Sequence, residues 1–196
     1  MRIAVIGTGN IGGTLGRAWA GAGHLVTFGS RHPAGADVVG ETDARVASIR
    51  DALEAADVVL LAIPAGMVNA MLAEHAGGLD GRLVIDATNN VGSAVVNASA
   101  EITAAAPTAR YVRAFNSLGW ENLANPQFGG VPADMFFSGP ATDRAVVGQL
   151  ISDVGLRPAY LGENKQGVVD GVLPLWFNLV QAHGGNRRVA LRVLTD

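Results

Sequence analysis

The segment RIAVIGTGNIGGTLGRAWAGAGHLVTFGSR, residues 2–31, places three glycines between two apolar patterns of different period. The run Arg2–Ile6 has the length and the Val and Ile content of a buried strand, and Ile11–Ala22 has helical spacing. The glycines between them follow the pattern G-x-G-x-x-G. A strand, this pattern and a helix, in that order, are typical of dinucleotide-binding βαβ units. The segment therefore predicts a nucleotide site rather than a merely structural turn.

Each glycine has its own role in such a unit. Gly7 permits the tight turn, Gly9 lets the backbone approach a pyrophosphate, and Gly12 lets the helix lie close to the strand. The N–H groups at the start of the helix, together with its dipole, then face the phosphates.

The second predicted strand, Leu25–Phe28, is followed by a Ser-Arg pair where many dinucleotide sites have an acid. That acid, about 20 residues after the glycines, accepts hydrogen bonds from ribose hydroxyls. Here the place is taken by Ser30 and Arg31. An acid would repel a 2′-phosphate, whereas a guanidinium binds it through charge-assisted hydrogen bonds and a serine hydroxyl donates as well. The pair predicts a preference for NADP over NAD, and the alternative is an exposed arginine that binds nothing.

Short apolar runs continue along the chain and alternate with stretches of helical spacing. The further predicted strands are Val58–Ile63, Leu83–Asp86, Tyr111–Phe115, Met135–Phe137, Arg157–Leu161 and a weaker one at Arg45–Ala47. The predicted helices are Ile49–Ala56, Gly66–His75 and Ala145–Val154, the first capped by Ser48. This alternation predicts an α/β fold: a Rossmann-like, doubly wound, mainly parallel sheet covered on both faces.

The pattern changes at Gly167. We expect an NADP-binding domain over residues 1–166 and a short C-terminal helical segment over 167–196, too short for a domain of its own. Its apolar stripe is expected to pack on the sheet, on a partner subunit or over a ligand. That stripe consists of Val168, Val172, Leu175, Trp176, Leu179 and Val180.

Composition narrows the possible functions. The 196 residues are 49% hydrophobic and 16% charged, which suits one globular domain with an appendage. A net charge of −3 argues against a nucleic-acid partner. Without cysteine, disulfides, thiolate metal sites and thiol nucleophiles are excluded. We also expect no membrane partner, because no apolar run is long enough to span a bilayer and no signal peptide is recognisable. A cytoplasmic protein is the expectation.

Few residues suggest acid–base or metal chemistry. The four histidines show no metal-ligand spacing, and no Ser-His-Asp grouping is evident, so we expect no metal site. Asn116 follows the strand YVRAF and is the candidate catalytic residue. Together with Asn89 and Asn90, which follow VIDAT, it is a candidate for polar contacts to the reacting rings of a cofactor and its substrate. The alternative for these asparagines is ordinary turn chemistry at strand ends. The aromatic residues Trp120 and Trp176 either line a binding site for a tricyclic ring or belong to the core, where Trp19 is expected.

The chain resembles the NADPH-dependent reductases of the deazaflavin coenzyme F420, also called F420-dependent NADP oxidoreductases. The resemblance rests on GTGNIGGTLGRAWAGAGHLVTFGSR, DVVLLAIP, VIDATNN, AFNSLGWENLANP, MFFSG and GLRPAYLG, and it extends from Met1 through the LWF segment. Members of this family are small Rossmann proteins, often dimeric, that pass a hydride between NADP and the deazaflavin ring. The resemblance therefore implies NADP(H) as cofactor, F420 as second substrate and a homodimer.

The resemblance also implies roles for individual residues. Those implied to hold the pyrophosphate are Thr8, Gly9, Asn10 and Ile11, and those for the 2′-phosphate are Ser30 and Arg31. The resemblance implies that Ile63, Pro64 and Met67 lie along the nicotinamide ribose. It implies that Asn89 and Ala114 complete the nicotinamide pocket. Ligands of doubly wound sheets bind beyond the carboxyl ends of the strands, where all these positions are predicted.

Two other functions remain open: an NADPH-dependent reductase of a flavin, imine or carbonyl compound, and a module that senses NADPH without turnover. Imine reductases with this kind of N-terminal domain add a large helical dimerisation domain, for which we expect no room here. The cluster Arg187, Arg188 and Arg192 would either bind the phosphate and glutamate tail of F420 or form a solvated helix face.

Overall fold

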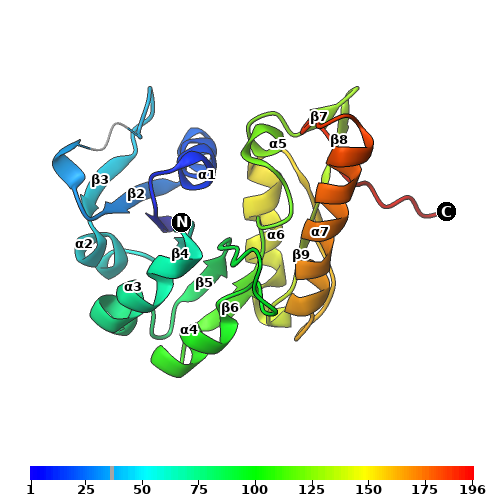
Figure 1. Cartoon of the computed structure of the whole chain (residues 1–196). Coiled ribbons are helices and arrows are strands. Elements are labelled where there is room, and N and C mark those ends of the chain that lie inside the picture. Colours follow the sequence, from blue (N-terminus) through cyan, green and yellow to red (C-terminus); the bar gives the residue numbers. More distant parts are fainter. Residues whose placement is uncertain (36–37) are drawn as a thin grey trace.

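Six parallel strands form the main sheet of the protein, seen in a computed structural model that describes residues 1–35 and 38–196 (Figure 1). The strands are β1 (Arg2–Ile6), β2 (Leu25–Ser30), β3 (Arg45–Ser48), β4 (Val58–Leu61), β5 (Leu83–Asp86) and β6 (Arg110–Arg113). Their order in the sheet is β3-β2-β1-β4-β5-β6. The chain leaves β1 in one direction toward β3 and in the other toward β6, so a crevice opens above the β1/β4 boundary at the carboxyl edge.

Helices cover both faces of this sheet, because alternate residues of each buried strand point to opposite sides. On one face Val5 and Leu60 pack with α1, and on the other Ile6 and Leu61 pack with α2, α3 and α4. These helices are α1 (Asn10–Gly21), α2 (Ile49–Glu54), α3 (Val68–His75) and α4 (Ser99–Ala105). The predicted cap of α2 is confirmed, since Ser48 Oγ accepts a hydrogen bond from Asp51 N at 3.1 Å. The Rossmann-like fold predicted from the sequence is confirmed.

Residues beyond β6 form a second, smaller layer that packs on the α1 side (Figure 1). Its elements are α5 (Trp120–Ala124), β7 (Gln127–Phe128), β8 (Val131–Pro132), β9 (Asp134–Phe137), α6 (Arg144–Asp153) and β10 (Arg157–Tyr160). Strands β9 and β10 pair in parallel as a separate two-stranded sheet. The two strands predicted here are thus present, but they do not extend the main sheet.

The chain turns away at the end of β6, which explains this difference. The strand predicted over Tyr111–Phe115 ends at Arg113, and Phe115 has a φ of +60°. A phenylalanine in the left-handed region cannot continue a strand. The main sheet meets the second layer through one antiparallel bridge, between Arg113 and Ser138. Trp19 of α1 is buried, as predicted, and its indole donates to Leu150 O of α6 at 2.9 Å.

The C-terminal helix α7 (Gln166–Ala182) buries a face different from the predicted one. Trp176 and Val180 are buried as expected, but Val168 and Leu175 of the predicted stripe are 58% and 48% exposed. Val169 and Leu173, at i and i+4, complete the buried face instead. Apolar residues occur on both sides of this helix, so periodicity did not determine which side faces the core.

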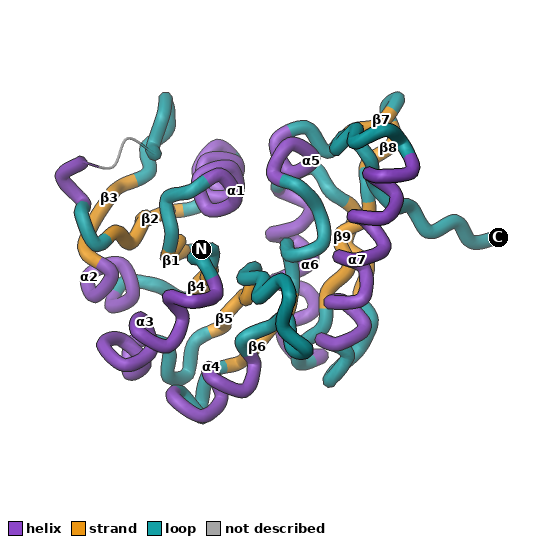
Figure 2. The backbone as a smooth tube through the Cα atoms, in the orientation of Figure 1, coloured by secondary structure: helices purple, strands orange, loops and turns teal. Residues whose placement is uncertain are grey.

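The predicted helical segment also ends earlier than residue 196. Helix α7 ends at Ala182, and residues 183–196 run back along α5 and β9 without helix or strand before the C-terminus projects from the molecule (Figure 2). None of the helices in the described ranges is long and apolar enough to cross a membrane.

Candidate functional site

The glycine turn after β1 has the geometry that its sequence predicts. Gly7 has a φ of +116°, and a Cβ at this position would collide with Ala62 O of the neighbouring segment after β4. A Cβ at Gly12 would collide with Gly7 O, so helix α1 lies directly against the turn. Both positions therefore require glycine, one for its backbone conformation and both for the close approach.

Gly9 differs from the other two, because a Cβ there would meet nothing within 4 Å. It is exposed at the start of α1, between the exposed residues Thr8 and Asn10. The first turn of α1 contains no acid and donates no hydrogen bond to a side-chain cap. The free N–H groups and the positive end of the helix dipole thus face an open surface, which suits an anion such as a pyrophosphate.

Ser30 and Arg31 lie at the carboxyl end of β2. Arg31 is exposed, and its guanidinium has no hydrogen bond or ion pair to any residue in 1–35 and 38–196. Ser30 Oγ accepts a hydrogen bond from His32 N at 3.1 Å, so its own proton stays available to a ligand. A cation without a partner among the described residues, beside a hydroxyl that can still donate, fits an additional phosphate at this point.

A cavity of about 150 Å³ lies beside Arg31. Three residues assigned by the resemblance to the nicotinamide ribose line it: Ile63, Pro64 and Met67. Glu74 and His75 of α3 line it as well. The structure therefore groups these three residues with Arg31, on the β2 side of the glycine turn.

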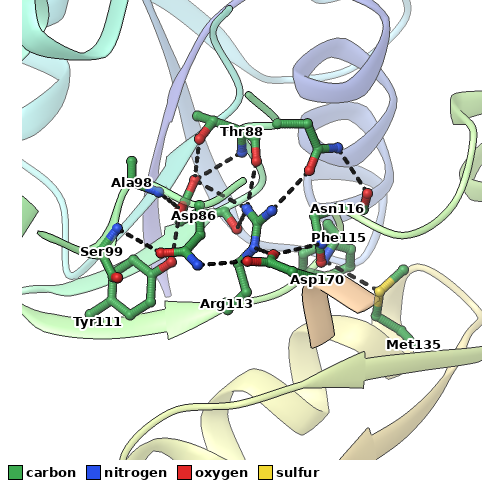
Figure 3. Close-up of polar contacts among 12 residues, drawn as sticks. Asp86, Thr88, Ala98, Ser99, Tyr111, Arg113, Phe115, Asn116, Met135 and Asp170 are labelled. Carbon is green, nitrogen blue, oxygen red and sulfur yellow. Dashed lines mark hydrogen bonds and ion pairs between the residues drawn. The ribbon is translucent and has the colours of Figure 1, made fainter. Parts of the chain in front are cut away.

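A buried polar network lies at the carboxyl ends of β5 and β6 (Figure 3). At its centre is Arg113, whose side chain is 0% exposed. Its Nε donates to Asp170 Oδ1 of α7 at 2.7 Å, and its Nη1 donates to the carbonyls of Asp86 and Thr88 at 3.0 and 2.6 Å. Its Nη2 donates to Asn89 Oδ1 at 2.8 Å. One guanidinium thus connects β5, the segment after β5, and α7.

The two carboxylates of this network are satisfied from several directions. Asp86 accepts from the backbone N–H groups of Thr88 and Ala98, both at 2.9 Å, as well as from the Thr88 and Tyr111 hydroxyls. Burial, and then the nearby Asp86 charge, raise the pKa of Tyr111 above its usual value, so this phenol stays a donor. Asp170 Oδ2 accepts from Asn97 Nδ2 at 2.6 Å. Buried carboxylates bonded in this way hold their surroundings rigid.

The candidate residues Asn89 and Asn116 belong to this network. Asn89 Nδ2 donates to Asn116 O at 2.9 Å, and Asn116 Nδ2 approaches Asp170 Oδ1 at 3.4 Å. Among the described residues, Asn116 Oδ1 and Ser117 Oγ are buried and have no partner. Ala114, also assigned to the pocket, is fully buried and donates its N–H to Asp86 O at 3.3 Å.

Sequence reasoning missed Arg113 and Asp170. A signal was present, since each is the one charged residue within an apolar run, YVRAF and VVDGVL. Charged residues buried in such runs are almost always paired. The partner of each was not predictable, because Arg113 and Asp170 are 57 residues apart.

The C-terminal arginines are engaged within the chain. Arg187 forms an ion pair with Glu121 at 2.6 Å, and hydrogen bonds from Arg187 hold the pKa of Glu121 below its usual value. Arg188 Nη1 donates to Asn125 O at 2.6 Å, and Arg192 Nη1 donates to Pro132 O at 2.7 Å. These contacts favour a structural role over the binding of an F420 tail.

No cluster of His, Cys, Asp or Glu suited to a metal ion occurs in residues 1–35 and 38–196. His24 Nε2 forms a hydrogen bond with Asp153 Oδ2 at 2.8 Å, and its Nδ1 contacts the N-terminus at 3.2 Å. It therefore belongs to the surface between α1 and α6 rather than to the crevice.

Comparison with known proteins finds a family profile that matches the N-terminal part of the chain. Residues 2–90 match the sequence profile of the family described as NADP oxidoreductase, coenzyme F420-dependent. This part contains the glycine turn, the Ser-Arg pair and the cavity residues, so the resemblance is confirmed over it. No curated protein matches the chain.

Solved structures extend the likeness to the whole chain. A proposed F420-dependent NADP reductase from Arthrobacter sp. FB24 has 24% identity and a TM-score of 0.82, with 100% of each chain covered. A hypothetical protein from Sinorhizobium meliloti has 28% identity and a TM-score of 0.69, with 100% of this chain and 96% of that chain covered. A reductive aminase from Aspergillus terreus in complex with NADPH has 20% identity and a TM-score of 0.72, with 94% of this chain and 62% of that chain covered.

Proposed function

We propose, on the premise that residues 2–90 belong to the family of F420-dependent NADP oxidoreductases, that this protein transfers a hydride between NADP(H) and coenzyme F420. The observation that carries the proposal is the exposed Arg31, which lies at the end of β2 where an acid would select NAD. It lies at the same sheet edge as the open glycine turn, and together they match the charges of NADP: a pyrophosphate and a 2′-phosphate.

The adenosine half of the cofactor would bind on the β2 side of the turn. Thr8, Gly9, Asn10 and Ile11 would hold the pyrophosphate through backbone N–H groups, because the open space at Gly9 admits a phosphate. Ser30 and Arg31 would bind the 2′-phosphate. Since that phosphate belongs to the adenosine ribose, we propose that the cavity lined by Ile63, Pro64 and Met67 takes the adenine.

The nicotinamide half would lie over β4, β5 and β6, beside Asn89, Ala114 and Asn116. When bound, NADPH supplies the hydride, and this chemistry requires neither a nucleophile nor a metal. The protein's own residues then have to orient two flat rings at contact distance and exclude water. The rigid, buried network below Asn89 and Asn116 suits that task, and Asn116 is the residue we propose to touch the reacting rings.

One experiment tests the proposal. The purified protein is mixed with NADPH and oxidised F420, and in parallel with FMN or a cyclic imine, while the absorbance of each acceptor is followed. Consumption of F420 with matching loss of NADPH is the expected result. Turnover of the imine or FMN alone would favour the alternative function, an NADPH-dependent reductase of a flavin, imine or carbonyl compound. The fold that this chain shares with the reductive aminase supports that alternative. Tight binding of NADPH without any turnover would favour a sensor.

We also propose a homodimer, formed through the exposed side of α7. Val168 and Leu175, which share one side of the helix, are 58% and 48% exposed there, and the one charged residue of the helix, Asp170, is on the buried side. A second copy of this chain would cover an uncharged apolar face of this kind. Sedimentation should show a dimer that Leu175→Lys dissociates, and a monomeric wild type would contradict it. A cytoplasmic location, where both coenzymes are available, completes the proposal.

A further inference from the structure

The direction in which two amides point is fixed by charged neighbours. A guanidinium has N–H donors and no acceptor. Asn89 therefore turns its Oδ1 to Arg113 Nη2, at 2.8 Å, and its Nδ2 away, toward Asn116 O at 2.9 Å. The reverse orientation would place the NH₂ donor of Asn89 against the Nη2 donor of Arg113.

Asn116 is oriented in the opposite sense. An ionised carboxylate accepts hydrogen bonds and cannot donate, so Asn116 turns its Nδ2 to Asp170 Oδ1, at 3.4 Å. Its Oδ1 is then the free group, buried and without a donor among the described residues. An amide oxygen buried in this way requires a donor, and the described part of the chain provides none.

We infer that Arg113 and Asp170 are positioning residues for the nicotinamide half of the cofactor, and that they fix Asn89 as a donor and Asn116 as an acceptor. The inference rests on the proposed function. Nicotinamide carries a carboxamide, which offers one carbonyl acceptor and an NH₂ donor, so it complements this pair of amides. Arg113 is itself inaccessible to a ligand, with 0% exposure, and acts through the asparagines.

The position of Asp170 on α7 gives this inference a second consequence. Helix α7 reaches the segments after β5 and β6 through the bonds of Asp170 to Arg113 and Asn97. The orientation of Asn116 thus depends on where α7 lies. Binding of the nicotinamide half is therefore coupled to the position of α7 against the sheet.

The test compares two ligands on three variants. Titration calorimetry measures the Kd for NADPH and for adenosine 2′,5′-bisphosphate, which has the 2′-phosphate and adenine but no nicotinamide. Asp170→Asn frees the Asn116 amide to flip, and Asn89→Asp keeps an oxygen toward Arg113 but presents an acceptor to the ligand. Each should weaken NADPH about tenfold, the loss of roughly one hydrogen bond, and leave the bisphosphate unchanged.

Asp134→Asn is the matched control. Asp134 is also buried and bonded to an arginine, Arg157, but it belongs to β9. It should leave both affinities unchanged. Equal weakening of both ligands, or no weakening of NADPH by either test variant, would overturn the inference, and having two variants keeps the test decisive if one of them fails to fold. A wild type that binds neither ligand would instead overturn the proposed function, and the inference with it.

Discussion

At the scale of single residues, we propose that Arg31 determines which dinucleotide the site prefers. It is exposed, lies at the end of β2 and lines the cavity beside Ile63. A guanidinium in that place binds a phosphate through charge-assisted hydrogen bonds, and no acid precedes it at the strand end.

Arg31→Asp should therefore weaken NADPH by roughly 1.5–3 kcal/mol, about ten- to a hundredfold in Kd, because it removes hydrogen bonds to a charged group. NADH binding should barely change. Fluorescence titration with both cofactors measures the effect. Arg45→Asp, at the opposite, amino end of β3, is the control and should alter neither. Equal losses for NADPH and NADH would refute the specificity of Arg31.

The glycines make a second prediction at this scale. Gly9 has a φ of −77°, and a Cβ there would meet open space, so Gly9→Ala should still fold. The free energy of unfolding should fall by no more than about 1 kcal/mol, because alanine is a poorer helix cap than glycine. The variant should nevertheless weaken NADPH about tenfold, because a methyl group blocks the phosphate. Gly12→Ala should cost about 1–3 kcal/mol in folding, since its Cβ collides with Gly7 O. Thermal unfolding and NADPH titration of both variants separate the two effects.

At the scale of elements, strand β9 is stabilised by charge. Asp134 accepts from Arg157 Nη2 at 2.6 Å and from Val193 N at 2.7 Å. Burial opposes ionisation of this carboxyl, but these hydrogen bonds outweigh it and hold the pKa of Asp134 below its usual value of 3.8. Its contribution to folding is therefore complete above the pKa of the unfolded chain and is lost as the pH falls through the lower folded value.

Asp134→Asn should thus lower the free energy of unfolding by roughly 1.5–3 kcal/mol at pH 7, the worth of a hydrogen bond to a charged group. The difference from wild type should shrink as the pH falls from 3.8 through the lower pKa of the folded carboxyl. Urea unfolding at pH 7 and pH 3 measures it. A difference independent of pH would contradict the assignment, and Asp196→Asn at the exposed C-terminus should show none.

The elements differ in how far the sequence predicts them. Strands β1, β2 and β4 and helix α1 were predictable, because buried parallel strands and an amphipathic helix have clear periods. The separate β9–β10 sheet was not, since it depends on the turn at Phe115, a residue with no preference for a positive φ. Likewise the residues that we propose to bind phosphate follow from a local motif, whereas the Arg113–Asp170 pair depends on long-range packing.

At the scale of the whole molecule, the C-terminal tail after α7 accepts hydrogen bonds from buried side chains of α5 and α7. Trp176 Nε1 donates to Val189 O at 2.7 Å, and Asn122 Nδ2 donates to Arg187 O at 2.9 Å. Both side chains are buried. The tail therefore satisfies polar groups of α5 and α7 that water does not reach.

Truncation after Gly185 should lower the free energy of unfolding by roughly 2–6 kcal/mol, because two buried donors lose their acceptors at about 1–3 kcal/mol each. Guanidinium unfolding checks this. Truncation after Leu194, which removes two residues with no described contacts, should have no effect. Unchanged stability of the shorter form together with a raised KM for F420 would restore the ligand-binding interpretation of the arginines.

The buried ion pair between Arg113 and Asp170 has a consequence for melting. One partner belongs to the six-stranded sheet and the other to the C-terminal helix. If either part came apart first, the other would keep an unneutralised charge in its interior, which is strongly unfavourable. Scanning calorimetry should consequently record one cooperative transition, with equal calorimetric and van't Hoff enthalpies, and Asp170→Asn should let the peak broaden or split.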